Sequence, residues 1–135
     1  MTLSAQQVAD LLVAALAVNS YPLVQAWALL PALREQGLVD PAVVAALRNE
    51  EIAERLDRAG YRRGQVNFIV GPRLHELMQS IHAGALADLP ARVADGDQAA
   101  ALKLLQTVPG VGPKVSARAW QLLTTTARPG DRPRE

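Results

Sequence analysis

Hydrophobic residues in this chain recur every three or four positions, which is the spacing of one face of an α-helix. No segment rich in β-branched residues alternates with a period of two, so the pattern predicts no β-strand. The clearest case is a first helix from the N-cap Ser4 to about Asn19, whose apolar face consists of Val8, Leu11, Leu12, Ala15 and Leu16.

Proline, glycine and capping residues delimit the next helices. The second helix contains Pro31, which kinks or breaks it, and ends at Gly37. Asp40 is the predicted N-cap of a short third helix, and Asn49 is that of a fourth helix ending at about residue 59.

A fifth helix is predicted from the apolar residues between Val66 and Ile81. Gly71-Pro72 interrupts it, as a kink or as a boundary between two abutting segments, because a proline removes an N–H donor from the helix interior. The following segment, residues 84–96, reads as a loop that leucine and valine side chains anchor.

Asp97 is predicted to cap a sixth helix, and a seventh begins at Pro113. We therefore expect one all-α domain over residues 1–126, a compact bundle of about six or seven helices. Residues 127–135 have almost no apolar content and are expected to form a disordered basic tail.

Composition excludes several classes of protein. The 135 residues include no cysteine, so the chain has no disulfide, no thiolate zinc site and no cysteine-held iron–sulfur cluster. We expect no cofactor. The N-terminus has no secretion signal, and the longest apolar run, residues 8–18, is too short to span a bilayer. These features predict a soluble, cytoplasmic protein without a membrane partner.

Charge is distributed unevenly along the chain. Residues 1–100 contain eight arginines and eleven acidic residues, whereas residues 101–135 contain six basic and two acidic residues. A phosphate-binding surface requires such a local excess of positive charge. A short basic C-terminus also serves as a solubilising tail, so charge alone does not establish a function.

The most informative motif is residues 108–114, Val-Pro-Gly-Val-Gly-Pro-Lys, between the last two predicted helices. Gly110 and Gly112 can take positive φ values, and Pro113 suits the first position of a helix. We expect the turn to present free backbone amides at the positive end of that helix, which is a phosphate site. The alternative is an ordinary helical hairpin with a glycine-rich turn.

This motif resembles the helix-hairpin-helix of DNA-binding proteins, and most closely that of the endonuclease III-like base-excision DNA glycosylases. The resemblance covers about residues 8–126, with the hairpin at residues 98–126, and its specificity lies mostly in residues 108–114. It implies duplex DNA, damaged or abasic, and a repair protein as partners. The implied DNA-binding residues are Pro109, Gly110, Val111, Gly112, Lys114 and Arg118.

The same resemblance makes Lys114 the candidate catalytic residue, because a lysine here attacks the sugar C1′ in the family's bifunctional members. The family's catalytic aspartate has no good counterpart, since Asp131 lies in a Pro-Gly-Asp-Arg-Pro segment four residues from the chain end. The family's second helical domain and cysteine-bound cluster are absent. The leading hypothesis is therefore DNA binding without sequence specificity, with base-excision repair as its setting.

Two alternatives stay open. One is an active DNA glycosylase or abasic-site lyase that uses Lys114. The other is a helical protein-interaction module, which an exposed cluster of Tyr21, Trp27 and Trp120 would favour. Trp120 is expected to pack into the core instead.

Two further pairs of residues are candidates for function. His75 and His82 share one face of a helix, but no third ligand accompanies them, so no metal site is predicted. Arg62 and Arg63 could contact DNA, although a solvated loop is the preferred interpretation.

Overall fold

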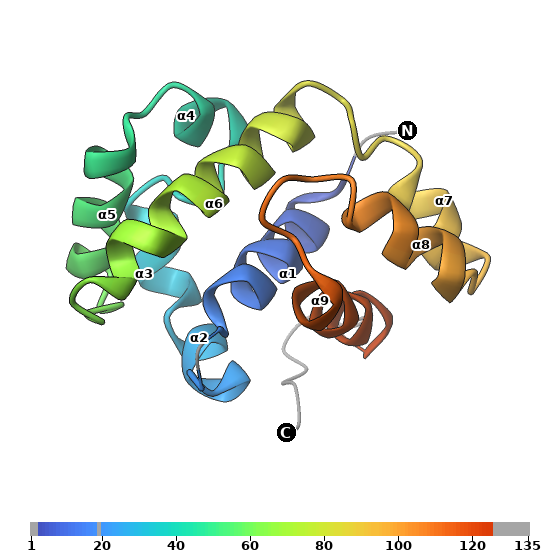
Figure 1. Ribbon diagram of the computed structural model, residues 1–135, viewed down its shortest axis with the longest axis horizontal. Helices are drawn as coiled ribbons and strands as arrows, with labels where there is room; N and C mark the ends of the chain where they lie inside the picture. The colour runs from blue at the N-terminus through green and yellow to red at the C-terminus, as the bar shows by residue number, and fades with distance from the viewer. Residues whose placement is uncertain (1–2, 19, 126–135) are drawn as a thin grey trace.

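The computed structural model describes residues 3–18 and 20–125, and within these ranges the chain is helical with no strand (Figure 1). This confirms the predicted all-α fold. The described residues form nine helices: α1 (Ala5–Leu16), α2 (Leu23–Ala28), α3 (Leu30–Glu35), α4 (Pro41–Ala45), α5 (Asn49–Arg58), α6 (Val66–His82), α7 (Leu89–Ala94), α8 (Gln98–Leu105) and α9 (Pro113–Thr125).

The helices outnumber the predicted six or seven for two reasons. The second predicted helix is divided at Leu29 into α2 and α3, and Pro31 lies in the first turn of α3. Residues 84–96, predicted to be a loop, contain the short helix α7. Leu86 and Leu89 are buried there and anchor this segment to the core, as the sequence indicated.

Of the two forms of interruption predicted at Gly71-Pro72, the division into two abutting segments is wrong, because α6 continues through both residues. Pro72 removes the donor for the carbonyl of Phe68, but Phe68 is 65% exposed, so water can take the donor's place. Gly71 is buried beside the start of α5, where an added Cβ would lie 3.3 Å from the carbonyl oxygen of Asn49. The Gly-Pro pair thus marks a close helix–helix approach.

Three of the four predicted N-caps are confirmed. The side chains of Ser4, Asp40 and Asp97 each accept a hydrogen bond from an amide in the first turn of their helix. The fourth is displaced by one residue. Asn49 is the first residue of α5, and Arg48 occupies the N-cap position. The carboxylate of Glu51 accepts a hydrogen bond from the backbone amide of Arg48 at 3.0 Å.

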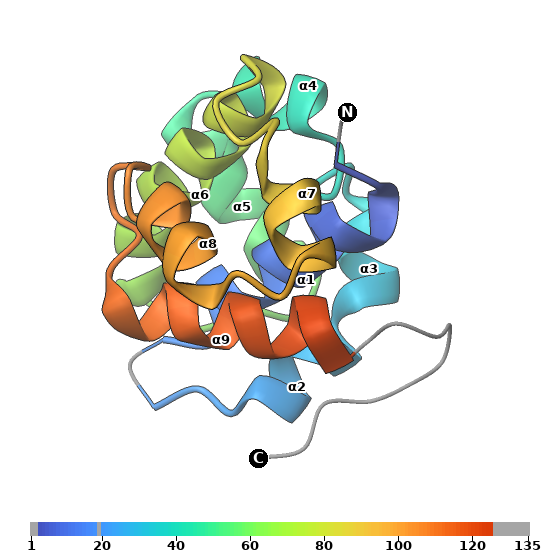
Figure 2. The same ribbon diagram turned by 90° about the vertical axis from the view of Figure 1, so that its right-hand side faces the viewer.

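Helix α1 lies at the centre of the fold and packs on α9, α2 and α6. On one side α6 packs against α4 and α5, and on the other α7 and α8 cover α9 (Figure 2). Eight of the twelve residues of α1 are buried, including Asp10, which accepts a hydrogen bond from Gln6 at 3.1 Å. Because α1 is buried on nearly all faces, it can gain most of its stability only from its neighbours.

The C-terminal end of α1 is capped by side chains from distant parts of the chain. Helix ends leave carbonyls without intrahelical partners, and in the core these require donors. Here the carbonyls of Leu16, Ala17 and Val18 each accept from a side chain. In that order, the donors are the Tyr61 hydroxyl at 2.7 Å, the Arg118 guanidinium and the Arg63 guanidinium at 2.6 Å.

Tyr61 holds this end of the core together. Its side chain is completely buried, its ring meets that of Tyr21 edge-on with centroids 5.0 Å apart, and its oxygen also accepts from Arg63 at 3.0 Å. Burial raises the pKa of the Tyr61 phenol, which Arg63 partly opposes. The phenol therefore stays a neutral hydrogen-bond donor at ordinary pH.

Residues 127–135, predicted to be a disordered basic tail, lie outside the described residues, as does Asp131. Among the described helices, none combines the length and the apolar character that crossing a membrane requires.

The substitution Tyr61→Phe should lower the free energy of unfolding by about 1–3 kcal/mol, because it leaves the carbonyl of Leu16 without its donor in a buried site. Urea denaturation followed by circular dichroism measures this loss. Tyr21→Phe is the matched control, since the Tyr21 hydroxyl has no hydrogen-bond partner among the described residues. Equal losses in the two variants would show that the carbonyl caps contribute little.

Candidate nucleic-acid interface at the hairpin

Helices α8 and α9 form a hairpin through the turn at residues 106–112, which lies beside α6 (Figure 1). Val108 is buried and anchors the turn, and the amide of Val111 donates to the carbonyl of Val108 at 3.1 Å. Gly110 adopts φ +87°, a conformation that L residues rarely take. The predicted positive φ is confirmed at Gly110 but not at Gly112.

A buried serine fastens the two helices together behind the turn. The hydroxyl of Ser116 donates to the carbonyl of Pro113 at 3.0 Å and accepts from the side-chain amide of Gln106 at 3.0 Å. Ser116 itself is completely buried. The geometry of the turn is thus fixed by hydrogen bonds on its inner side.

Several amides of the turn have no acceptor within the described part of the chain. Helix α9 begins at Pro113, as predicted, and its first internal bond runs from Ser116 to the carbonyl of Gly112. Among the described residues, nothing accepts from the amides of Gly110, Gly112, Lys114 and Val115.

These unpaired amides correct one part of the sequence analysis. Val111 was expected to offer its amide to a phosphate, but that amide is used within the turn. Lys114 and Val115, in the first turn of α9, provide free amides instead. The arrangement is that of a helix N-terminus able to bind an anion.

The predicted side chains of the site divide into two groups. Pro109 and Lys114 are exposed at the turn, and Lys114 makes no ion pair with any described residue. Arg118 is half-buried and donates to the carbonyl of Ala17 at the end of α1. Arg118 therefore has a structural role, and its contact with DNA stays a prediction.

Arg73, on α6, is a neighbour of the turn that the sequence analysis did not identify. An added Cβ at Gly110 would lie 2.9 Å from Cγ of Arg73 and 3.3 Å from its Cβ, so the stem of Arg73 lies directly against the turn. No local pattern in the sequence indicated this approach, because it depends on how α6 packs relative to the hairpin.

Arg62 and Arg63, the other candidates for contact with DNA, lie in different surroundings. Arg63 caps α1 and lies over the rings of Tyr21 and Tyr61, at 5.0 and 5.6 Å from their centroids. Arg62 is exposed and contacts the backbone carbonyl of Asp57 at 3.2 Å. The preferred interpretation of a solvated loop thus holds for Arg62 and not for Arg63.

The histidines and the large aromatic residues do not form a second site. The ring of His75 lies 3.1 Å from the carbonyl of Ala45, and the described residues contain no group of three potential metal ligands. Trp120 packs against the core, as predicted, and so do Tyr21 and Trp27, each of them half-buried. These three aromatics therefore do not form an exposed cluster.

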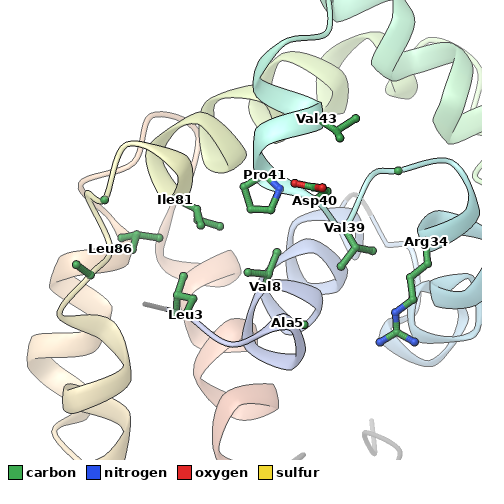
Figure 3. Close-up of a pocket in the computed structure, with 13 residues that line it drawn as sticks. Leu3, Ala5, Val8, Arg34, Val39, Asp40, Pro41, Val43, Ile81 and Leu86 are labelled. Atoms are coloured by element: carbon green, nitrogen blue, oxygen red, sulfur yellow. The ribbon is translucent and has the colours of Figure 1, made fainter. Parts of the chain in front are cut away.

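A groove of about 590 Å³ lies away from the hairpin, between the start of α1, the α3–α4 connection and the end of α6 (Figure 3). Its lining is apolar except for Arg34 and Asp40, and Figure 3 shows Val8 and Ile81 bordering the space beside Pro41. The carboxylate of Asp40 already caps α4. The groove thus lacks paired acid–base or metal-binding groups.

Comparisons of this chain with family models, with curated proteins and with solved structures give no match. The resemblance of the hairpin to that of the endonuclease III-like glycosylases stays a prediction from the sequence. The geometry of the turn therefore provides the structural basis for the function proposed below.

The two glycines of the turn should respond differently to substitution. Gly110→Ala should lower the free energy of unfolding by at least about 1–2 kcal/mol, because φ is +87° and the new Cβ would collide with Arg73. Gly112→Ala should be tolerated, since a Cβ there meets nothing within 4 Å and φ is not positive. Thermal and urea unfolding of both variants test this, and equal losses would contradict the described turn.

Proposed function

We propose that this protein binds DNA through the α8–α9 hairpin and holds the phosphate backbone without reading base sequence. The observation that carries the proposal is the set of unpaired amides of Gly110, Gly112, Lys114 and Val115 at the start of α9. An anion at this point would satisfy these donors and would interact favourably with the dipole of a 13-residue helix.

The charges of α9 support an anionic partner. Acidic side chains normally favour the first turn of a helix, yet the first turn of α9 has none and carries Lys114 instead. A cation at the positive end of a helix is unfavourable unless an anion lies nearby. A bound phosphate would remove this cost and would interact with both the amides and the ammonium group.

The chemistry of such a site also defines its selectivity. Amides and lysines that contact phosphate oxygens position a protein on DNA but carry no direct information about base sequence. Their binding releases counterions and weakens as the salt concentration rises. The excess of basic over acidic residues within the segment 101–135 is consistent with this mode of binding. The resemblance noted in the sequence supports damaged or abasic DNA, in a repair setting, as the ligand.

Lys114→Ala should weaken binding to a DNA duplex a few-fold and should reduce the slope of log K against log salt by about one unit. Fluorescence anisotropy with a labelled duplex, measured between low and moderate salt, gives both quantities. Arg58→Ala removes an exposed charge on α5 and serves as the matched control. If Lys114→Ala behaves like Arg58→Ala, the hairpin has only a structural role.

The second candidate function is abasic-site lyase chemistry, favoured by the exposed amine of Lys114 beside the predicted phosphate site. In this reaction the neutral amine adds to the C1′ aldehyde of the opened sugar, and the aldehyde oxygen leaves as water to give the Schiff base. Borohydride trapping on abasic DNA tests it. Any nicking or trapping should be lost in Lys114→Ala and should survive in Asp131→Asn.

We expect no release of normal or oxidised bases at useful rates, because Asp131, the one aspartate near the spacing that the resemblance implies, lies in a Pro-Gly-Asp-Arg-Pro segment that is not expected to hold it for departure of the base. Base release from duplex DNA is measured by cleavage of labelled strands after alkaline treatment. Efficient base excision that is lost in Asp131→Asn would overturn this expectation and would assign the protein glycosylase activity.

A further inference from the structure

Arg73 lies where a ligand of the hairpin would be bound. Its Cγ and Cδ would lie 2.9 and 3.5 Å from a Cβ at Gly110, so the guanidinium begins one bond beyond an atom that already borders the turn. Gly110 is also one of the residues whose amide has no acceptor among the described residues. Helix α6 thus brings a cation to the same turn that the start of α9 supplies with amides.

Among the described residues, the guanidinium of Arg73 has no partner. The residue is exposed, and its side chain makes no hydrogen bond or ion pair within the described chain. Glu76 lies one turn further along α6, at a spacing that permits an ion pair, yet none is formed. The five donors of a guanidinium are arranged to bind two oxygens of one phosphate at once.

We propose that Arg73 is a second phosphate-binding residue of the hairpin site, acting from α6 on the phosphodiester that the amides of the turn hold. This inference rests on the proposed DNA binding. The phosphate would accept from the α9 amides on one side and from the Arg73 guanidinium on the other. A glycine at position 110 then serves two purposes. A side chain there would strain the turn, and it would also displace Arg73.

The test uses two variants that separate charge from geometry. Arg73→Met keeps the aliphatic stem against Gly110 and removes the charge. It should weaken binding to duplex DNA about three- to tenfold and reduce the salt slope by about 0.9. Arg73→Lys keeps the charge and loses the bidentate geometry, so it should preserve the salt slope while affinity falls.

Arg58→Met on α5 is the matched control, because it removes an exposed arginine whose only ion pair with a described residue, Glu54 at 3.9 Å, is weak. Its affinity and salt slope should equal those of the unmodified protein. Urea unfolding of each variant checks that the fold is retained. If Arg73→Met matches Arg58→Met in affinity and slope, the proposed role of Arg73 is wrong.

A second measurement distinguishes failure of this inference from failure of the proposed function. In a ¹⁵N NMR titration with the duplex, the amides of Gly110 and Gly112 and the Nε of Arg73 should shift together at the same DNA concentrations. Shifts of the two glycine amides without Arg73 would overturn the role of Arg73 alone. The absence of shifts at all three groups would overturn DNA binding at the hairpin as well.

Discussion

The buried end of α1 is the constraint on which the rest of this fold depends. A helix that is buried on nearly all faces cannot leave its last carbonyls to water, because an unpaired polar group in the core costs about 1–3 kcal/mol. Tyr61, Arg63 and Arg118 meet this requirement from two other parts of the chain. The positive charges of Arg63 and Arg118 also lie at the negative end of the helix dipole, where cations are favourable. The position of α9, and therefore of the hairpin, follows from this requirement.

Local signals were sufficient to predict much of the fold. Ser4, Asp40 and Asp97 act as caps within four residues of their own position, and Pro113 begins α9 because a proline suits the first helical turn. The same local rules predicted an interruption at Gly71-Pro72, yet α6 runs through both residues. There, Gly71 is buried against the start of α5, and Phe68, whose carbonyl loses its donor, is 65% exposed. The spacing of residues along the sequence does not indicate these tertiary effects.

Part of the candidate site was predictable, because some of its features depend only on neighbouring residues in the sequence. The turn and its free amides follow from residues 108–114, which are contiguous in the sequence. The assignment of the arginines was not predictable, because Arg118 caps α1 and Arg73 approaches the turn from α6. The hydrogen bond of Val111 within the turn also required three-dimensional geometry. The inner side of the hairpin is held by Ser116 and Gln106, which fixes the geometry of the turn without any ligand.

The capping of α1 has a consequence for the order in which this protein is made. Tyr61 and Arg63 each lie 45 residues from the carbonyl that they cap, whereas Arg118 lies 101 residues from Ala17. A ribosome produces Ala17 101 residues before Arg118. During synthesis the central helix α1 therefore waits for this partner, and its core face is open to chaperones or to other nascent chains in that interval. Helix α9 completes both the core around α1 and the hairpin, so a chain that stops before α9 lacks the Arg118 cap of α1 and the proposed DNA site together.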